Sequence, residues 1–288
     1  MNPSSENFLF GLRAHELGRS SAAMLARRIA AQGASCVQLA LGKAIEGLEL
    51  RPGVINADMA SAIRRDFERH QLQIAVLGCY INPIHPDIEV RKGLLGLFRE
   101  HLRHARDFGC NIVALETGSV NSDYSPHPDN HGETAFRTLV VSIAELVREA
   151  ERCGVVVGVE AVTSHVISTP EKMSRLLDEI PSPNLQVVFD PVNLLSIENH
   201  GEQEAIMEDA FRRFGDRIAV IHAKDFLVND GELAFVAPGS GSLNRSLLLS
   251  LAQTHLRDAF IVLEEVDASN AVETLESMKK ETLMMTFA

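Results

Sequence analysis

Four residues with metal-binding side chains end short apolar segments in the second half of the chain. They are Glu160 after VVVGV, Asp190 after LQVVF, His222 after IAVI, and Glu264 with its neighbour Glu265 after AFIVL. Carboxylate oxygens and an imidazole nitrogen together suit a hard or borderline divalent ion such as Mn, Mg, Co or Zn. Without an ion, three carboxylates crowded in a low dielectric would repel one another. If these side chains meet in space, the sequence predicts a site for one divalent metal ion.

The spacing of these residues suggests the elements that position them. Successive members lie 30, 32 and 42 residues apart, about one strand and one helix each. Most of the apolar segments are unbroken runs, as is typical of parallel strands buried on both faces. Eight such segments recur along the chain, starting near Phe8, Cys36, Gln73, Asn111, Gly154, Leu185, Ile218 and Ala259.

Helical patterns separate the apolar segments. One ends at Gly109 and another at Gly154, each after a charged last turn, which is a helix C-terminus signal. The stretch STPEKMSRLLDEI has the signature of a helix start, with Ser168 or Thr169 as the cap and Pro170 in the first turn. Strands alternating with helices and no linker predict an α/β fold, a (β/α)8 TIM barrel, as one domain over residues 1–288. The alternative is a doubly wound open sheet, but FGLRAHELG after the first strand lacks a Gly-rich phosphate loop.

The barrel explains why polar residues end apolar strands. Active sites of TIM barrels lie at the C-terminal ends of the strands and in the loops that follow. We therefore expect the four metal-binding residues at one rim of the barrel. A polar loop at residues 118–133 is predicted to cover this rim, and VNDGELAF is predicted to form a small hairpin.

Composition restricts the function classes. The chain has 288 residues, 45% of them hydrophobic, and a net charge of −12, which disfavours binding to nucleic acid or an anionic membrane. No apolar run approaches the ~18 residues of a membrane span, and the N-terminus has no secretory apolar segment. The four cysteines form no C-x-x-C pair, so we expect buried free thiols and a reduced, cytoplasmic protein.

A family resemblance is carried by several motifs in order along the chain. VGVEAV, STPEKMSRLLDEI, VVFDPVNLL, VIHAKDF, PGSG and VLEEV resemble the xylose-isomerase-like superfamily of sugar phosphate isomerases and epimerases, and CYINPIHPD and LETGS are similar to bacterial members. The resemblance extends from about Phe8 to Glu276. It implies a TIM barrel with one catalytic divalent ion, often Mn, held by Glu160, Asp190, His222 and Glu264. Glu264 is preferred to Glu265 because it directly follows the apolar strand residues, and strand neighbours point to opposite faces.

The resemblance also implies an activity. Glu160 and Glu264 would both bind the ion and move protons, one removing the proton next to a substrate carbonyl and the other returning a proton. The ion would stabilise the enediolate as a Lewis acid. The implied partner is a small sugar, sugar phosphate or related polyol, and a homo-oligomer is compatible with it. Sugar epimerases of the family often carry a histidine where this chain has Asn193, which cannot take a proton.

Other polar residues are candidates for binding the substrate. Lys224 shares the strand-face parity of His222, and the alternative for it is a salt bridge with Asp225. The remaining candidates follow other strands: Glu116, His165, Asn193 and His85, with Arg13, His15 and Tyr80 as weaker ones. His101 and His104 are expected on the solvated face of an outer helix.

Three other functions remain open. Enediolate chemistry also allows a dehydratase of a cyclic polyol or keto acid on the same metal site. An endonuclease for abasic DNA would need further metals and histidine ligands, and the negative charge argues against it. A non-catalytic sugar-binding barrel is the third alternative.

Overall fold

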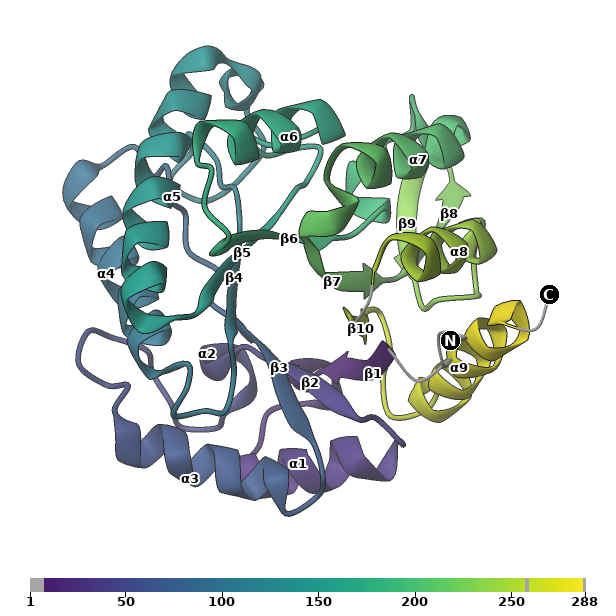
Figure 1. Cartoon of the computed structure of the whole chain (residues 1–288), viewed down its shortest axis with the longest axis horizontal. Coiled ribbons are helices and arrows are strands. Elements are labelled where there is room, and N and C mark those ends of the chain that lie inside the picture. The colour runs from purple at the N-terminus through teal and green to yellow at the C-terminus, as the bar shows by residue number, and fades with distance from the viewer. Residues whose placement is uncertain (1–7, 257–258, 287–288) are drawn as a thin grey trace.

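The strands close into a parallel barrel (Figure 1). The computed structural model describes residues 8–256 and 259–286, so residues 1–7, 257–258 and 287–288 of the expected single domain lie outside the described part. Neighbouring strands are hydrogen-bonded in the order β1-β2-β3-β4-β5-β6-β7-β10, and β10 pairs with β1. The predicted (β/α)8 TIM barrel is confirmed. The barrel strands are β1 (Phe8–Arg13), β2 (Cys36–Leu39), β3 (Gln73–Gly78), β4 (Ile112–Glu116), β5 (Val156–Glu160), β6 (Leu185–Phe189), β7 (Ile218–Ala223) and β10 (Ala259–Leu263).

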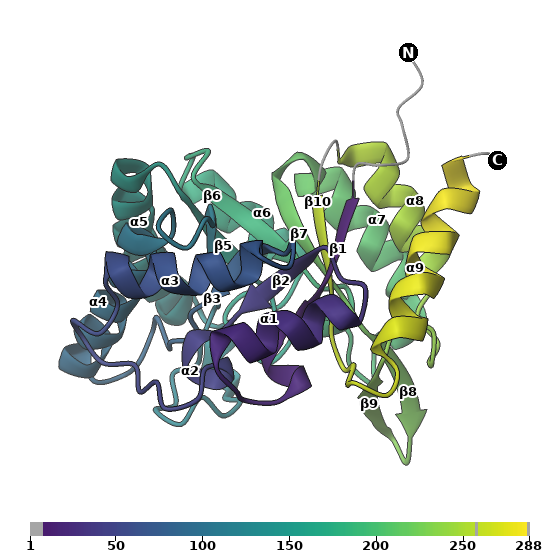
Figure 2. The ribbon, with the colours of Figure 1, turned by 90° about the horizontal axis from the view of Figure 1, so that it is seen from below.

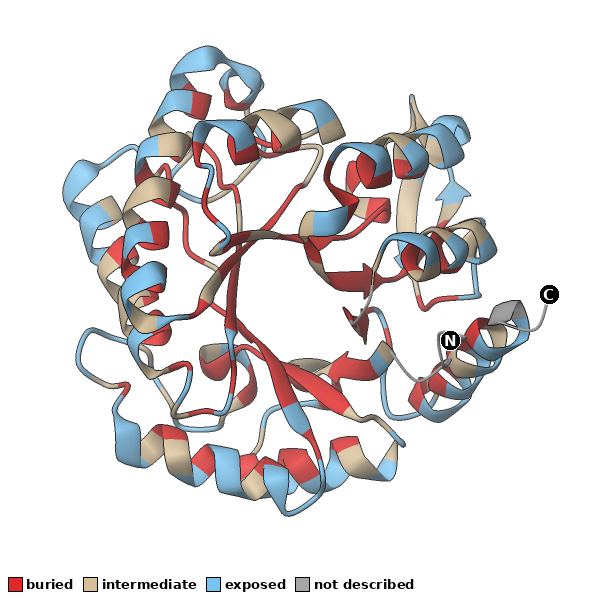
Figure 3. Ribbon diagram, in the orientation of Figure 1, coloured by how far each residue is buried: buried red, intermediate tan, exposed pale blue. Residues whose placement is uncertain are grey.

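Helices surround the barrel and follow the predicted patterns. Figure 3 shows their buried residues facing the strands and their exposed residues facing outward. The four-residue helix α2 was not predicted, because one turn has too few residues to show a period. The helices are α1 (Ala22–Ala31), α2 (Leu41–Ala44), α3 (Ala57–Glu68), α4 (Ile88–His104), α5 (Glu133–Cys153), α6 (Pro170–Glu179), α7 (Gln203–Phe214), α8 (Arg245–His255) and α9 (Ala271–Thr286).

Local sequence signals set the helix ends that lead into the site. Thr169, rather than Ser168, caps α6 by accepting a hydrogen bond from the backbone N–H of Lys172. Gly154 ends α5 with φ of 63°, in the left-handed region that glycine adopts most readily. The chain then enters β5, which ends at Glu160.

Two apolar layers hold the strands in place. A small cluster that includes Val76, Val188, Val220 and Val262 is separate from the larger core, which includes residues of the strands and of the surrounding helices. Burial on both faces explains why the strands read as unbroken apolar runs. The barrel is thus a packed scaffold whose polar strand ends are held by a rigid core.

A hairpin follows β7 after a single residue, Lys224. It consists of β8 (Asp225–Asn229) and β9 (Glu232–Val236), paired antiparallel, and its turn residues Asp230 and Gly231 have positive φ as predicted for an Asp-Gly turn. Figure 2 shows β8 and β9 projecting beyond the barrel. The hairpin therefore starts at the strand end that carries His222.

Two side expectations have different outcomes. The prediction of a solvated face was wrong for His101, which is fully buried in α4, where Nδ1 lies 2.9 Å from the carbonyl oxygen of Leu97. All four cysteines are free, and three are buried, while Cys153 is partly exposed.

None of the described helices has the length and apolar character needed to cross a membrane.

Candidate metal centre

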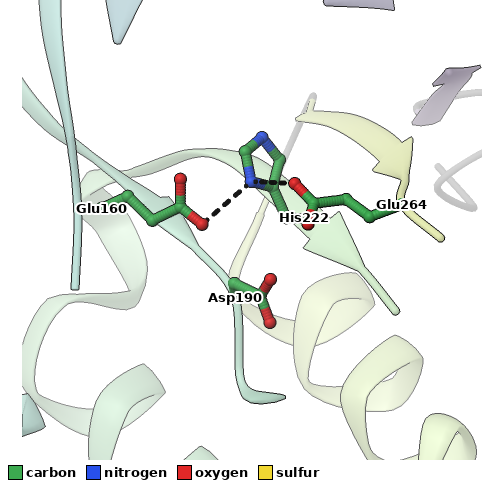
Figure 4. Close-up of side chains that lie close together, drawn as sticks. All are labelled: Glu160, Asp190, His222 and Glu264. Atoms are coloured by element: carbon green, nitrogen blue, oxygen red, sulfur yellow. Dashed lines mark hydrogen bonds and ion pairs between the residues drawn. The ribbon is translucent and has the colours of Figure 1, made fainter. Parts of the chain in front are cut away.

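Four strands deliver the predicted metal-binding residues to one point (Figure 4). Glu160 is the last residue of β5, Asp190 directly follows β6, His222 is the penultimate residue of β7, and Glu264 directly follows β10. One potential ligand atom from each residue lies within 4.8 Å of the others. All four residues are at most 3% exposed. The structure therefore brings together the four residues that the sequence pattern selected.

The imidazole of His222 lies between the two glutamates. Its Nδ1 is 3.1 Å from Oε1 of Glu160 and 3.0 Å from Oε1 of Glu264 (Figure 4). Two ligand atoms that bind one ion at about 2.1 Å and at right angles are about 3 Å apart. The spacing of these atoms therefore fits cis ligands of one divalent ion, and their chemistry of three carboxylates and one imidazole suits Mn, Mg, Co or Zn.

Close carboxylates shift the proton equilibria of the site. Burial lowers the pKa of His222, but the charges of Glu160 and Glu264 outweigh it and raise this pKa to about 10. Burial raises the pKa of Glu264, but His222 and Lys224 outweigh it, so the pKa is lowered overall. Burial raises the pKa of Asp190 to about 6, with the nearby glutamates adding to the rise and Lys224 opposing it. The site thus holds its negative charge only with cations inside it.

Lys224 supplies one such cation. Its Nζ lies 2.9 Å from Oδ2 of Asp190 and 3.3 Å from Oε2 of Glu264. Burial lowers the pKa of Lys224, but the charges of Asp190 and Glu264 outweigh it and raise the pKa. The ring of Phe235 on β9 lies 4.8 Å from Nζ, so the hairpin covers the lysine from above.

Asp225 does not pair with Lys224, so the alternative salt bridge is wrong. Its two carboxylate oxygens accept hydrogen bonds from the backbone N–H groups of Phe226, Gly239, Gly241 and Leu243, at 2.8–3.0 Å. Asp225 therefore holds the PGSG loop against the end of β7.

Asn193 connects the two sides of the centre. It lies in the 3-10 turn Val192–Leu194 after β6. Its Nδ2 donates a hydrogen bond to Oε1 of Glu160 at 2.8 Å, and its Oδ1 accepts one from Lys224 at 2.6 Å. An amide can satisfy a carboxylate and an ammonium at once because it carries both a donor and an acceptor.

Two further contacts of the centre were missed or underrated from sequence. The guanidinium of Arg13, the last residue of β1, lies 3.0 Å from Oε1 of Glu264. Gln38 of β2 is fully buried, and its Oε1 lies 2.7 Å from Nε2 of His222. The signal for Gln38 was its position, since it is the polar residue in the apolar run CVQLAL.

A second group of candidates flanks Glu160. Glu116 pairs with Glu160 in register across β4 and β5, and Nδ1 of His165 lies 3.5 Å from Oε2 of Glu116. Burial and the charge of Glu160 raise the pKa of Glu116 to about 7, while burial lowers that of His165 to about 4. Tyr124, from the predicted covering loop, packs edge-on against the ring of His165 at 4.9 Å. These groups form one polar wall beside the four candidate metal ligands.

His85 lies apart from this wall. Its ring accepts a hydrogen bond from the backbone N–H of Asp87 at 3.1 Å, at the start of α4. Its hydrogen bonds are made with Asp87 and Arg91, which are close in the sequence, and its predicted role toward a substrate stays a prediction.

Fold and site together define a TIM barrel with a candidate divalent-metal centre at the C-terminal ends of its strands. Residues 26–281 match the family described as xylose isomerase-like TIM barrel, and the chain belongs to this family. The resemblance read from the motifs is thereby confirmed.

Individual relatives include sugar epimerases. The chain is 32% identical over 124 residues to a D-psicose 3-epimerase of Enterocloster bolteae, a match that covers 42% of this chain and 36% of that protein. The chain thus aligns with only about a third of the epimerase's length. A crystal structure of a D-tagatose 3-epimerase-like protein shares the fold with a TM-score of 0.75 at 20% identity, covering 96% of this chain and 98% of that one. A xylose isomerase-like TIM barrel protein of Mycobacterium smegmatis, solved in complex with magnesium, has a TM-score of 0.74 at 13% identity, with 99% of both chains covered.

Proposed function

We propose that this protein is a divalent-metal-dependent isomerase or epimerase of a small sugar, sugar phosphate or related polyol. The observation that carries the proposal is the placement of Glu160 and Glu264 on two sides of one imidazole nitrogen, at 3.1 and 3.0 Å. Two carboxylates held on opposite sides of one centre can remove a proton from one face of a substrate carbon and return one to the other. The epimerase names of two relatives and the xylose isomerase-like family support this class of reaction.

The metal ligands in this proposal are Glu160, Asp190, His222 and Glu264. A divalent ion bound there would polarise the substrate carbonyl as a Lewis acid and stabilise the negative charge of an enediolate. We favour Mn, with Mg, Co and Zn as alternatives that the same donor set accepts. The ion and the ammonium of Lys224 would together balance the charges of the three carboxylates, which explains why these acidic groups can be buried side by side.

The proton-moving residues are Glu160 and Glu264. Each has a fixed orientation, since Asn193 donates to Glu160 and Arg13 lies against Glu264. Carboxylates that are already held in one orientation lower the entropic cost of reaching the reactive geometry. Lys224 is placed to donate to a substrate oxygen that becomes negative, because its ammonium is already within the centre.

Substrate binding is assigned to the groups around the centre. Glu116 and His165 can bond hydroxyl groups on the Glu160 side, and Lys224 can do so on the Glu264 side. Phe235 offers an apolar face beside Lys224 that suits the C–H face of a sugar. His85 and Asn193 complete the proposed set, although the amide of Asn193 is already engaged with Glu160 and Lys224.

Asn193 also bears on which reaction is catalysed. Because an amide takes no proton, proton transfer falls to Glu160 and Glu264. A substrate with a leaving group next to the enediolate would then lose water, so a dehydratase of a cyclic polyol or keto acid is the alternative on the same site.

A solvent-exchange screen tests the proposal. Metal-loaded protein is incubated in D2O with ketoses, aldoses, inositols and sugar acids, and products are followed by NMR and mass spectrometry. We expect one substrate to gain deuterium next to its carbonyl and to form an isomer or epimer. Glu160→Gln and Glu264→Gln should abolish the exchange, while Glu89→Gln on the surface of α4 should not. Elimination of water would favour the dehydratase, and binding without exchange would contradict an enzyme.

A further inference from the structure

Gln38 contacts the His222 ring on the side that faces away from the proposed ion. Nδ1 of His222 faces the two glutamates, while Nε2 lies 2.7 Å from Oε1 of Gln38. Both residues are fully buried. A polar side chain placed without solvent contact inside the barrel needs a partner, and these two groups satisfy each other.

Of the two ring nitrogens of His222, one would bind the ion and the other would carry the ring proton. A nitrogen that binds a metal ion must present a lone pair, so the ring proton must lie on the other nitrogen. Because Nδ1 faces the ligand carboxylates, this requirement puts the proton on Nε2. The buried Nε2–H then needs an acceptor, and Oε1 of Gln38 is at hydrogen-bonding distance.

The proton on Nε2 of His222 decides which end of the Gln38 amide meets the histidine. Nε2 of Gln38 donates to the hydroxyl oxygen of Tyr80 at 2.5 Å. Rotating the amide by half a turn would put its N–H group against the Nε2–H of His222, donor against donor. The hydroxyl of Tyr80 can accept from or donate to the amide in either orientation, so the proton on His222 selects the one in which Gln38 donates to Tyr80.

We propose that Gln38 is a positioning residue of the metal centre. By accepting the hydrogen bond from Nε2–H, it holds the tautomer and ring orientation in which Nδ1 of His222 binds the ion. Partners of this kind, behind a metal-bound histidine, commonly change metal affinity 10- to 100-fold when removed. The inference rests on the proposed function, because it needs the ion, but it concerns a residue that binds neither ion nor substrate.

The test measures metal affinity in the whole protein. Mn²⁺ is titrated calorimetrically into the metal-free wild type, Gln38→Met and Gln38→Glu. Methionine keeps the length and removes the acceptor, whereas glutamate restores an acceptor. We expect Gln38→Met to weaken binding 10- to 100-fold and Gln38→Glu to bind as tightly as the wild type or more tightly. Gln186→Met is the matched control, because Gln186 also lies in a barrel strand but donates to the carbonyl oxygen of Pro183; its affinity should be unchanged.

A second measurement separates positioning from packing. With Zn²⁺ bound, the ¹⁵N shifts of the His222 ring should show a protonated Nε2 in the wild type and in Gln38→Glu. This readout remains available if Gln38→Met does not fold. An unprotonated Nε2 in the loaded wild type would overturn the proposal.

The outcomes distinguish this inference from the proposed function. A wild type that binds no Mn²⁺ would overturn the metal centre and the role of Gln38 with it. A wild type that binds Mn²⁺, with Gln38→Met binding equally well, would overturn the role of Gln38 alone. Equal losses in Gln38→Met and Gln38→Glu would also overturn it, since the acceptor would then not be the cause.

Discussion

The ammonium of Lys224 lies 2.9 Å from Oδ2 of Asp190, one of the four candidate metal ligands. This lysine was predicted from strand parity to face a substrate, and the structure gives it a closer neighbour, a carboxylate that is itself a proposed ligand. One cation therefore serves two ends. It compensates buried negative charge, and it leaves a donor beside the place where a substrate oxygen would bind.

Lys224→Met tests this double role. We expect it to keep about one divalent ion per chain near pH 8 and to lose roughly 10²-fold or more in turnover, the range typical of removing one electrostatic stabiliser. The charge of Lys224 lowers the pKa of Asp190, so loss of the ammonium would raise this pKa. Asp190 would then be protonated at a higher pH, and the ion should be lost more readily as the pH falls. Metal content and turnover are measured on one preparation.

The matched control for this variant is Lys92→Met. Lys92 pairs with Glu89 on the surface of α4 and should change neither quantity. Full turnover of Lys224→Met would show that the lysine only balances charge.

Removing a ligand should remove the ion. We expect the wild type to purify with a divalent ion and Asp190→Ala and His222→Ala to purify without it, because the remaining ligands are fewer and their carboxylates repel. Elemental analysis by mass spectrometry gives the content per chain. The control is Asp209→Ala, which removes the ion pair between Asp209 and Arg213 on α7 and should retain the ion. Wild-type metal levels in both ligand variants would place the ion elsewhere.

The barrel and the meeting of the four candidate metal ligands could be predicted because their signals are local. Parallel strands buried on both faces read as apolar runs, and Glu160 or His222 interrupts such a run where the strand ends. The strand ends of a closed barrel meet at one rim, so the order of elements alone predicts that these residues come together. Their proximity in the structure agrees with this reasoning, and their roles stay predictions.

The remaining contacts depend on packing that one sequence does not encode locally. Gln38 lies 184 residues from His222 along the chain, and only the closed barrel brings them together. Asn193 could be assigned to the rim, but its bridge between Glu160 and Lys224 depends on the geometry of the 3-10 turn after β6. The prediction for His101 was wrong because the charged residues beside it in the sequence do not show which face of the helix is buried, and this side chain is fully buried.

Asp225 is expected to matter for the loop rather than for the ion. Asp225→Ala would leave four backbone N–H groups without their acceptor, those of Phe226 and Leu243 at buried residues, and we expect a loss of about 2–3 kcal/mol in the free energy of unfolding. Gly241→Ala should perturb the same loop, since a Cβ there would lie 2.3 Å from the carbonyl oxygen of Phe226. Urea unfolding checks both variants.

Mn²⁺ binding by these variants distinguishes an effect on the loop from an effect on the metal centre. Both Asp225→Ala and Gly241→Ala should still bind Mn²⁺ if they fold, because neither residue is a proposed ligand. Gly231→Ala is a control for the hairpin tip, where nothing lies within 4 Å of an added Cβ, although its positive φ adds some strain. A fully stable Asp225→Ala would contradict the anchoring role.

Metal affinity should rise with pH. The pKa of His222 in the metal-free protein is about 10, so at neutral pH its ring carries a proton on Nδ1 that the ion must displace. One displaced proton makes the apparent affinity increase about tenfold for each pH unit between pH 7 and 9, and the increase should level off above the pKa. Below about pH 6, protonation of Asp190 should make the loss of affinity steeper.

Competition with a chelator of known affinity, in buffers of constant ionic strength, measures this slope. Calorimetry in two buffers with different ionisation enthalpies should report release of about one proton per ion at pH 8. The Gln38→Glu variant should show the same slope, because it changes the partner of Nε2 and leaves the proton on Nδ1 to be displaced. An affinity that does not change between pH 7 and 9 would show that no proton is displaced from Nδ1 in this range, and would contradict the raised pKa of His222 in the metal-free protein.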